Sequence, residues 1–103
     1  MYRVTIAYGQ PTDTAAFDEY YTGTHLPIAG KIPGVQRFAG GKCESLDGNP
    51  PAAYLLAEIF FADKDEAAAG FGSEEGQAAA ADIANFATGG ATIYFSNEDI
   101  TIP

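Results

Sequence analysis

Apolar residues recur at every second position near the start of the chain and predict a strand. At positions 2 to 8, the even residues are tyrosine, valine, isoleucine and tyrosine, and the odd ones are arginine, threonine and alanine. This period and the β-branched residues are typical of a strand with one buried face. Further strands are predicted over 35–46, 54–61 and 91–101. The segment 54–61 is apolar on both faces, which predicts a place in the middle of a sheet.

Two of these predicted strands contain unusual residues. Gly40 and Gly41 fall inside the second strand, and paired glycines there indicate a bulge or a close approach of another backbone. Glu58 falls inside the most apolar run of the chain. The pattern leaves open whether Glu58 lies at the surface or holds its carboxylate in a cavity.

A first helix is predicted between the first two strands. Either Thr12 or Asp13 can cap it, because both side chains can accept hydrogen bonds from the free amides of a first turn. Its buried side carries Phe17 and the tyrosines at 20 and 21. The segment Ile32-Pro33-Gly34 ends the helix, since proline cannot continue it and glycine permits the turn.

A second helix is predicted between the last two strands. Asp63 caps its start, with Glu66 as the reciprocal acid. Glycines interrupt the helix, and Ser73 caps a continuation to Phe86. The alanine run at 78–81 favours a helix and permits close packing on a sheet.

The order strand, helix, strand, strand, helix, strand predicts an α+β fold. It matches the ferredoxin-like βαββαβ arrangement, with a four-stranded antiparallel sheet and helices on one face, in a single domain over residues 1–103. The opposite face, where it is apolar, needs a cover. A second copy of the chain is the simplest one, so we expect a two-fold homodimer with the sheets face to face.

Composition narrows the classes of partner. The chain has 14 acidic and 5 basic residues and a net charge of -9, which disfavours binding to nucleic acid or to anionic membranes. No segment is apolar enough for a signal peptide or a bilayer span, so a cytoplasmic location is expected. The single cysteine, Cys43, fits a reducing compartment, and a buried inert thiol is its favoured interpretation.

The single histidine, His25, is the main candidate for chemistry. Imidazole titrates near neutral pH and is therefore suited to proton transfer. In a continuous helix Tyr21 and His25 share one face, which places a phenol beside the imidazole on an otherwise apolar stripe. We take His25 as a candidate general acid or base and Tyr21 as a hydrogen-bond donor. The alternative is a core histidine that donates to a backbone carbonyl.

The other residues favour a small apolar or aromatic ligand. One histidine and one cysteine do not make a zinc or iron site, so no metal is predicted, and no glycine-rich nucleotide loop is present. An aromatic-lined pocket with few polar groups binds such ligands. Phe17, Tyr8 and Ile28 are the predicted apolar contacts, and Arg37 could stabilise an anion such as an enolate or phenolate. A solvated surface arginine is the alternative for Arg37.

Three short motifs, in this order, resemble the EthD family of the dimeric α+β-barrel superfamily. They are Tyr21-x-x-x-His25-x-Pro27, Lys31-Ile32-Pro33-Gly34 and Asp82-Ile83-Ala84-Asn85-Phe86. The resemblance spans the chain and implies a ferredoxin-like subunit that dimerises through its sheet. It implies that His25 takes the family histidine's role, and that Asp82 and Asn85 hydrogen-bond and position the first helix.

The resemblance also bears on activity. Relatives in the superfamily include cofactor-free monooxygenases of polyketide phenols, lactone isomerases and decarboxylases, and EthD members are often labelled reductases. Haem-binding branches exist, so His25 could be an axial ligand, although no cofactor is predicted. We therefore expect a cofactor-independent oxidoreductase or isomerase acting on a small aromatic or polyketide-like compound. The alternatives are a noncatalytic binding or accessory protein for a hydrophobic metabolite, and a dimer whose pocket is packed shut.

Overall fold

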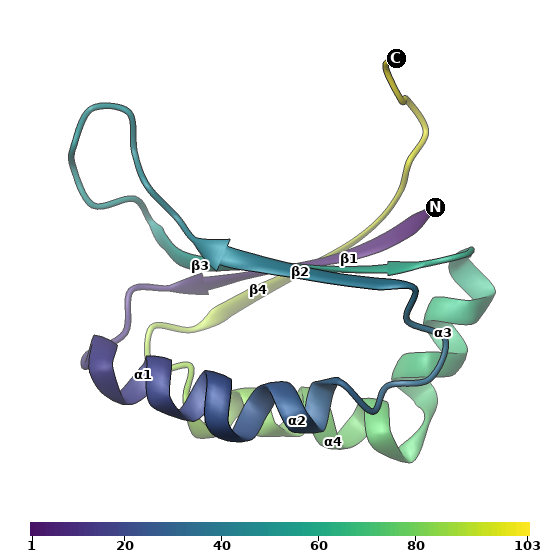
Figure 1. Cartoon of the computed structure of the whole chain (residues 1–103), viewed down its shortest axis with the longest axis horizontal. Coiled ribbons are helices and arrows are strands. Elements are labelled where there is room, and N and C mark those ends of the chain that lie inside the picture. The colour runs from purple at the N-terminus through teal and green to yellow at the C-terminus, as the bar shows by residue number, and fades with distance from the viewer.

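The computed structural model describes residues 1–103 as one sheet with helices on a single face (Figure 1). The strands are all antiparallel and lie in the order β2-β3-β1-β4. This confirms the α+β, ferredoxin-like prediction. Along the chain the elements are β1 (Tyr2–Gly9), α1 (Thr14–Tyr20), the π-helical segment η1 (Tyr21–His25), α2 (Leu26–Ala29), β2 (Arg37–Lys42), β3 (Ala53–Phe61), α3 (Lys64–Gly72), α4 (Glu74–Asp82), the short 3-10 helix η2 (Ile83–Asn85) and β4 (Ala91–Asn97).

The period of two puts one set of strand residues into the core. On β1 and β3, the two central strands, alternate side chains are buried against the helices: Val4, Ile6, Tyr8, Leu55, Ala57, Ile59 and Phe61. The central position predicted for the third strand is therefore confirmed. All three predicted helix caps are seen, with Asp13 rather than Thr12 capping the first helix. Asp13 accepts from the Ala16 amide (3.0 Å), Asp63 from that of Glu66 (2.8 Å) and Ser73 from that of Gly76 (3.0 Å).

Both outer strands are shorter than predicted, and for β4 the reason is that its partner ends. β4 stops at Asn97, which lies opposite Tyr2 at the start of β1, so no strand remains for residues 98–101 to join. β2 spans only six residues, and its pairing with β3 runs without a break through Gly40 and Gly41. The predicted bulge at these glycines is wrong.

A bulge does occur between β1 and β3. The pairing shifts between Tyr8 and Gly9, which leaves Tyr54 without a partner on β1. Tyr54 consequently joins Leu55 on the helix side of the sheet, where its hydroxyl donates to Asp18 of α1 at 2.8 Å. Lys42 contacts the same carboxylate at 2.7 Å and thereby ties the β2–β3 hairpin to the first helix.

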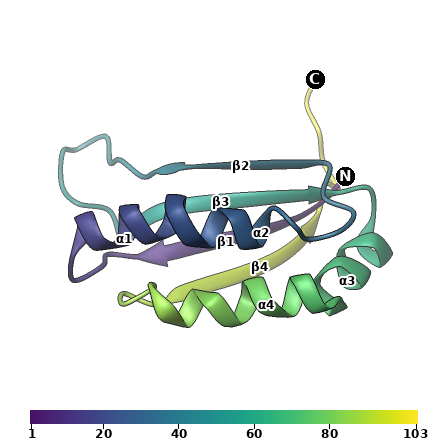
Figure 2. The ribbon, with the colours of Figure 1, turned by 60° about the horizontal axis from the view of Figure 1, so that its bottom comes forward.

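The helices form their own layer on one face of the sheet, and in the view of Figure 2 α1 and α2 lie in front of the strands. The alanine-rich helix α4 packs against α2 and α3. At the turn between α3 and α4, a Cβ on Gly76 would lie 2.1 Å from the Gly70 carbonyl oxygen, so this junction requires glycine. None of the helices has the length and apolar composition needed to cross a bilayer.

The other face of the sheet has no covering element within the chain. It presents a mixture of apolar and polar groups, and Arg3 and Glu58 lie 4.0 Å apart on it. Glu58 is therefore a surface residue rather than a carboxylate held in a cavity. The loop between β2 and β3 and the tail after β4 both extend beyond this face (Figure 1). They carry the strongly exposed side chains of Leu46, Ile100 and Ile102.

Candidate active site

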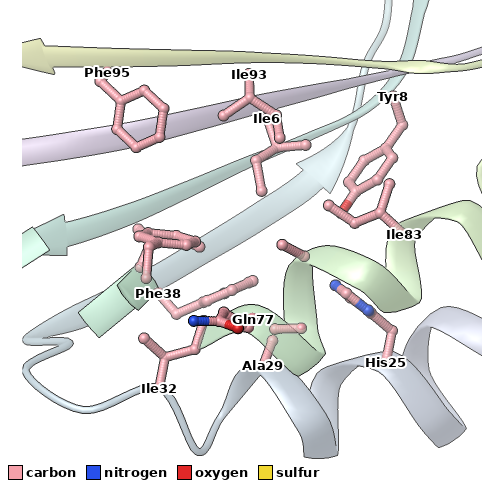
Figure 3. Close-up of a pocket in the computed structure, with 14 residues that line it drawn as sticks. Ile6, Tyr8, His25, Ala29, Ile32, Phe38, Gln77, Ile83, Ile93 and Phe95 are labelled. Carbon is pink, nitrogen blue, oxygen red and sulfur yellow. The ribbon is translucent and has the colours of Figure 1, made fainter. Parts of the chain in front are cut away.

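A cavity of about 380 Å³ lies between the sheet and the helices, and its wall is almost entirely apolar (Figure 3). Twelve of its 14 lining residues are hydrophobic, which leaves His25 and Gln77 as the polar ones. The exposed lining residues come from α4 and β4, so the cavity opens between these two elements. The lining consists of Ile6, Tyr8, His25, Ala29, Ile32, Phe38, Ile59, Phe71, Gln77, Ala79, Ala80, Ile83, Ile93 and Phe95.

His25 lies at the edge of the cavity with only 3% of its surface exposed. Its Nδ1 is 2.9 Å from Oδ2 of Asp82. No hydrogen bond within the chain involves the other ring nitrogen, Nε2. The partner of this histidine is therefore a buried carboxylate, and the alternative of a bond to a backbone carbonyl is not seen.

Asp82, at the end of α4, is the centre of a small polar network. Its Oδ1 accepts from the Tyr20 hydroxyl at 2.6 Å and from Asn85 Nδ2 at 3.0 Å, while Oδ2 faces His25. Burial disfavours the ionised carboxylate, but hydrogen bonds from Tyr20, Asn85 and His25 outweigh it and hold the pKa of Asp82 below its ordinary value. The carboxylate is thus ionised at neutral pH.

Beside His25, five rings form an aromatic cluster made of Tyr8, Phe17, Tyr21, Tyr54 and Phe86. The Tyr21 ring stacks on the imidazole with centroids 5.5 Å apart, and the Phe86 ring contacts it at 4.7 Å. The hydroxyls of Tyr8 and Tyr21 are buried without a hydrogen-bond partner. Burial raises the pKa of Tyr21 to about 12 and also raises the pKa of Tyr8.

The structure brings some of the predicted site residues together. Tyr8 and His25 line the cavity, and Asp82 and Asn85 hold the network behind the imidazole. Phe17 and Tyr21 are buried in the aromatic cluster and are not part of the cavity wall. Tyr21 thus supports the imidazole by stacking and does not reach a ligand.

Two predicted ligand contacts lie elsewhere. Arg37 is exposed on the opposite face of the sheet, over the Phe60 ring at 5.5 Å, because its neighbour Phe38 takes the inward position. Ile28 lies at the helix surface, since Ala29 is the residue that faces the cavity after His25. The predictions that Arg37 and Ile28 contact a ligand in this cavity are therefore corrected.

Several functional neighbours were not predicted. Tyr20 was expected only as a buried helix residue, and its bond to Asp82 depends on a π-helical turn that the sequence does not signal. Phe86 belongs to the Asp82–Phe86 motif, but the sequence gives no role for its ring. The aliphatic wall of the cavity follows from strand parity at Ile6, Ile59 and Ile93, although nothing in the pattern shows that a hollow lies above them.

The residues present do not suit a metal or a haem. No group of three or more histidine, cysteine, aspartate or glutamate side chains could hold a metal ion. A haem carries two carboxylates, but no lysine or arginine lines the cavity to pair with them.

Distant solved structures share the fold. A dimeric ferredoxin-like protein of unknown function from Jannaschia is 15% identical, with a TM-score of 0.69 over 94% of this chain and 99% of that chain. SnoaB, a cofactor-independent oxygenase from Streptomyces nogalater, is 13% identical, with a TM-score of 0.66 over 99% of this chain and 95% of its own. At these identities the likeness shows the fold alone.

Nearer relatives show the family. An uncharacterized 11.0 kDa protein of Rhodococcus erythropolis, from a thcB-thcC intergenic region, is 58% identical over all 103 residues of both chains. An EthD family protein from Bacillus halodurans is 31% identical, with a TM-score of 0.90 over 95% of this chain and 98% of that one. Residues 9–90 match the family model of the EthD domain. The chain therefore belongs to the EthD family.

Proposed function

We propose that this protein is an enzyme without a bound cofactor that transfers a proton to or from a small, uncharged aromatic or polyketide-like compound. The observation that carries the proposal is the position of His25. One ring nitrogen is held by a buried carboxylate, and the ring lines a cavity that is otherwise almost entirely apolar. The fold shared with a cofactor-independent oxygenase supports the reaction class and does not identify the reaction.

The pairing with Asp82 gives His25 a defined role. In the neutral imidazole whose Nδ1–H donates to the carboxylate, Nε2 carries no proton and can accept one from a bound molecule. The imidazolium that results is stabilised by the ionised Asp82. The same Nε2–H can then return its proton to another atom of the substrate, so His25 serves as base and acid in turn.

The cavity wall limits the substrate to uncharged molecules. No lysine or arginine lines the cavity, so a carboxylate or phosphate would be buried there without a fixed countercharge. A phenol, an enolisable ketone or a lactone enters uncharged and becomes an anion only when it gives its proton to His25. The charge that develops then lies next to the imidazolium.

Proton removal is a shared first step for the two reaction types that we expected. A phenolate or enolate can react directly with oxygen, as in a monooxygenase, or accept a proton at a different carbon, as in an isomerase. In both cases the substrate supplies the reactivity and the protein supplies the base. The oxidoreductase and isomerase assignments therefore predict the same essential residue.

The test is to replace His25 with Ala and follow the turnover of candidate phenols and lactones. Thr24→Ala is the matched control, because Thr24 lies on the exposed side of the same π-helical segment. Loss of about a hundredfold or more in turnover for His25→Ala, with Thr24→Ala close to the wild type, is expected for a general acid and base. Unchanged turnover in His25→Ala would remove the imidazole from the mechanism.

The apolar wall also favours a second candidate function, that of a noncatalytic carrier of a hydrophobic metabolite. A cavity with an imidazole at its edge and an otherwise almost entirely apolar wall can bind such a molecule without converting it. A carrier would show ligand-dependent increases in melting temperature with no product, and His25→Ala would weaken these increases only modestly.

The assembly we propose is a homodimer that joins the open sheet faces. Two fold neighbours, from Jannaschia and Thermobifida fusca, are described as dimeric ferredoxin-like proteins. In this chain no helix covers that face, and the tail and the β2–β3 loop that extend beyond it carry exposed apolar side chains. A cytoplasmic location stays a prediction.

A further inference from the structure

The π-helical turn allows two residues of the first helix to reach one carboxylate. In an α-helix, residues five apart such as Tyr20 and His25 point about 140° away from each other. Here the Leu26 amide donates to the Tyr21 carbonyl five residues earlier, so this turn holds an extra residue. The extra residue rotates His25 toward the side of Tyr20. Both side chains contact Asp82, which lies on α4.

We infer that Tyr20 is a positioning residue for His25, acting through Asp82, and that the π-helical turn is the backbone feature that makes this possible. The inference rests on the proposed function, in which Nε2 of His25 must be free of its proton. It assigns a role to a residue that does not touch the cavity.

The two carboxylate oxygens of Asp82 have different hydrogen-bond partners. Tyr20 and Asn85 donate to Oδ1, at 2.6 and 3.0 Å, and this fixes the rotation of the carboxylate. Oδ2 is then held at 2.9 Å from Nδ1 of His25. An ionised carboxylate oxygen in that position accepts a hydrogen bond and cannot donate one, so it selects the neutral imidazole form that carries its proton on Nδ1.

Tyr20 is itself held in place. Its ring stacks on Phe86 with centroids 5.5 Å apart, and the Phe86 ring also contacts the imidazole at 4.7 Å. Asp82, Asn85 and Phe86 all come from the end of α4 and the turn that follows. This short segment therefore fixes the hydroxyl donor, the carboxylate and the imidazole together.

The surroundings of His25 contain no rival for its Nδ1 proton. The titratable groups near the ring are Asp82 of α4, Tyr8 of β1, and Tyr20 and Tyr21 of its own helix. The Tyr8 and Tyr21 hydroxyls make no hydrogen bond. Loss of the Tyr20 hydroxyl would leave only Asn85 on Oδ1, and Oδ2 would be less firmly aimed at the imidazole.

Nuclear magnetic resonance of isotope-labelled histidine tests this inference without a known substrate. Because the chain has one histidine, the spectrum reports His25 alone. We expect the wild type to hold the proton on Nδ1, and Tyr20→Phe to shift the ratio of the two neutral imidazole forms by roughly tenfold toward Nε2–H. Tyr21→Phe is the matched control, since it removes the adjacent and unpaired hydroxyl, and it should leave the ratio unchanged.

An unchanged ratio in Tyr20→Phe would overturn the inference, as would an equal shift in Tyr21→Phe. Asn85→Ala covers the case in which Tyr20→Phe does not fold. It removes the longer of the two bonds to Oδ1 and should shift the ratio in the same direction by less, and no shift would again contradict the inference.

This result is separate from the test of function. If His25→Ala retains full turnover, the proposed function fails whatever the spectrum shows. If turnover does need His25 but Tyr20→Phe leaves the spectrum and the pH dependence of kcat unchanged, only the inference fails. If the proposed function and the inference are both correct, Tyr20→Phe lowers kcat about tenfold with little change in KM, because the substrate does not contact Tyr20.

Discussion

The layer between the sheet and the helices is filled with rings at one end and hollow at the other. Between α1 and the sheet, the aromatic cluster of Tyr8, Phe17, Tyr21, Tyr54 and Phe86 has neighbouring centroids 5.2 to 5.7 Å apart, mostly edge to face. Between α2 and the sheet, the side chains surround a cavity of about 380 Å³. Both ends belong to one layer that packs on the same two central strands.

The difference comes from the helix residues that face each end. α1 and the turn after α4 contribute large rings, whereas α4 contributes Ala79 and Ala80 to the cavity wall. An alanine at these positions cannot reach the sheet, and α4 rests on α2 and α3. Small residues on one helix therefore determine where the hollow lies. His25 lines the cavity and also contacts the aromatic cluster, so it lies at the boundary between the two ends.

Removal of an aromatic ring should give the largest difference in stability between the two ends. Phe86→Ala should lower the free energy of unfolding by about 3–5 kcal/mol, because Phe86 is 5% exposed and contacts four rings and the imidazole. Phe71→Ala at the hollow end should cost less than half as much, since Phe71 already borders empty space. Urea unfolding measures both. Equal losses of unfolding free energy in the two variants would contradict the claim that one end is solidly packed and the other is hollow.

A smaller effect should come from adding side-chain volume. Ala57→Leu on β3 should destabilise the protein by about 1–3 kcal/mol, because Ala57 is fully buried in the packed core and is not part of the cavity wall. Ala79→Leu should change the free energy of unfolding by less than about 1 kcal/mol, since its side chain can enter the cavity. The same variant should reduce ligand binding. If Ala79→Leu destabilises as much as Ala57→Leu, the cavity is not available space.

A still smaller effect of opposite sign is expected for Tyr21→Phe, which removes a buried hydroxyl without a partner. The free energy of unfolding should stay equal or rise by up to about 1 kcal/mol. The pKa of Tyr21 is raised to about 12 by burial. The folded state thus keeps this proton where the unfolded state loses it, and stability falls as pH rises from about 10 to 12. Tyr21→Phe should weaken that alkaline loss, and an unaltered alkaline profile would contradict the burial of the hydroxyl.

The smallest effect concerns acid. The pKa of Asp82 is lower when the protein is folded, so its ionised form contributes stability above the ordinary carboxyl pKa of about 3.9. This contribution is lost as pH falls through the lower, folded-state value. Asp82→Asn lacks the titrating group and should show a flatter dependence of unfolding free energy on pH in that range. A wild-type slope in Asp82→Asn would place the responsible carboxylate elsewhere.

Most of the fold could be predicted because each element carries a local signal. The alternation in β1, the apolar run of β3 and the three observed caps are all readable from neighbouring residues. The sequence does not show which residues of β2 face the helices. Gly40 and Gly41 remove the alternation that would have put Phe38 inside and Arg37 outside.

The candidate site was predicted less completely because it depends on contacts between distant segments. The importance of His25 follows from its chemistry, and the resemblance implies that Asp82 holds the first helix, but the pairing of Asp82 with His25 itself was not predicted. The role of Tyr20 requires a π-helical turn, which no residue type specifies. To predict the hollow, one must know that α4 packs against α2 and α3, and this is a property of the folded molecule.

The most direct test of the account is a titration of histidine-labelled protein with naphthol, a neutral aromatic phenol, followed at the imidazole nitrogens of His25. The account predicts a saturable shift of the Nε2 signal in the wild type and its loss in Ala79→Leu, whose side chain fills the cavity. An imidazole spectrum that does not respond to naphthol, or that responds equally in Ala79→Leu, would contradict the claim that His25 faces a cavity that binds ligands.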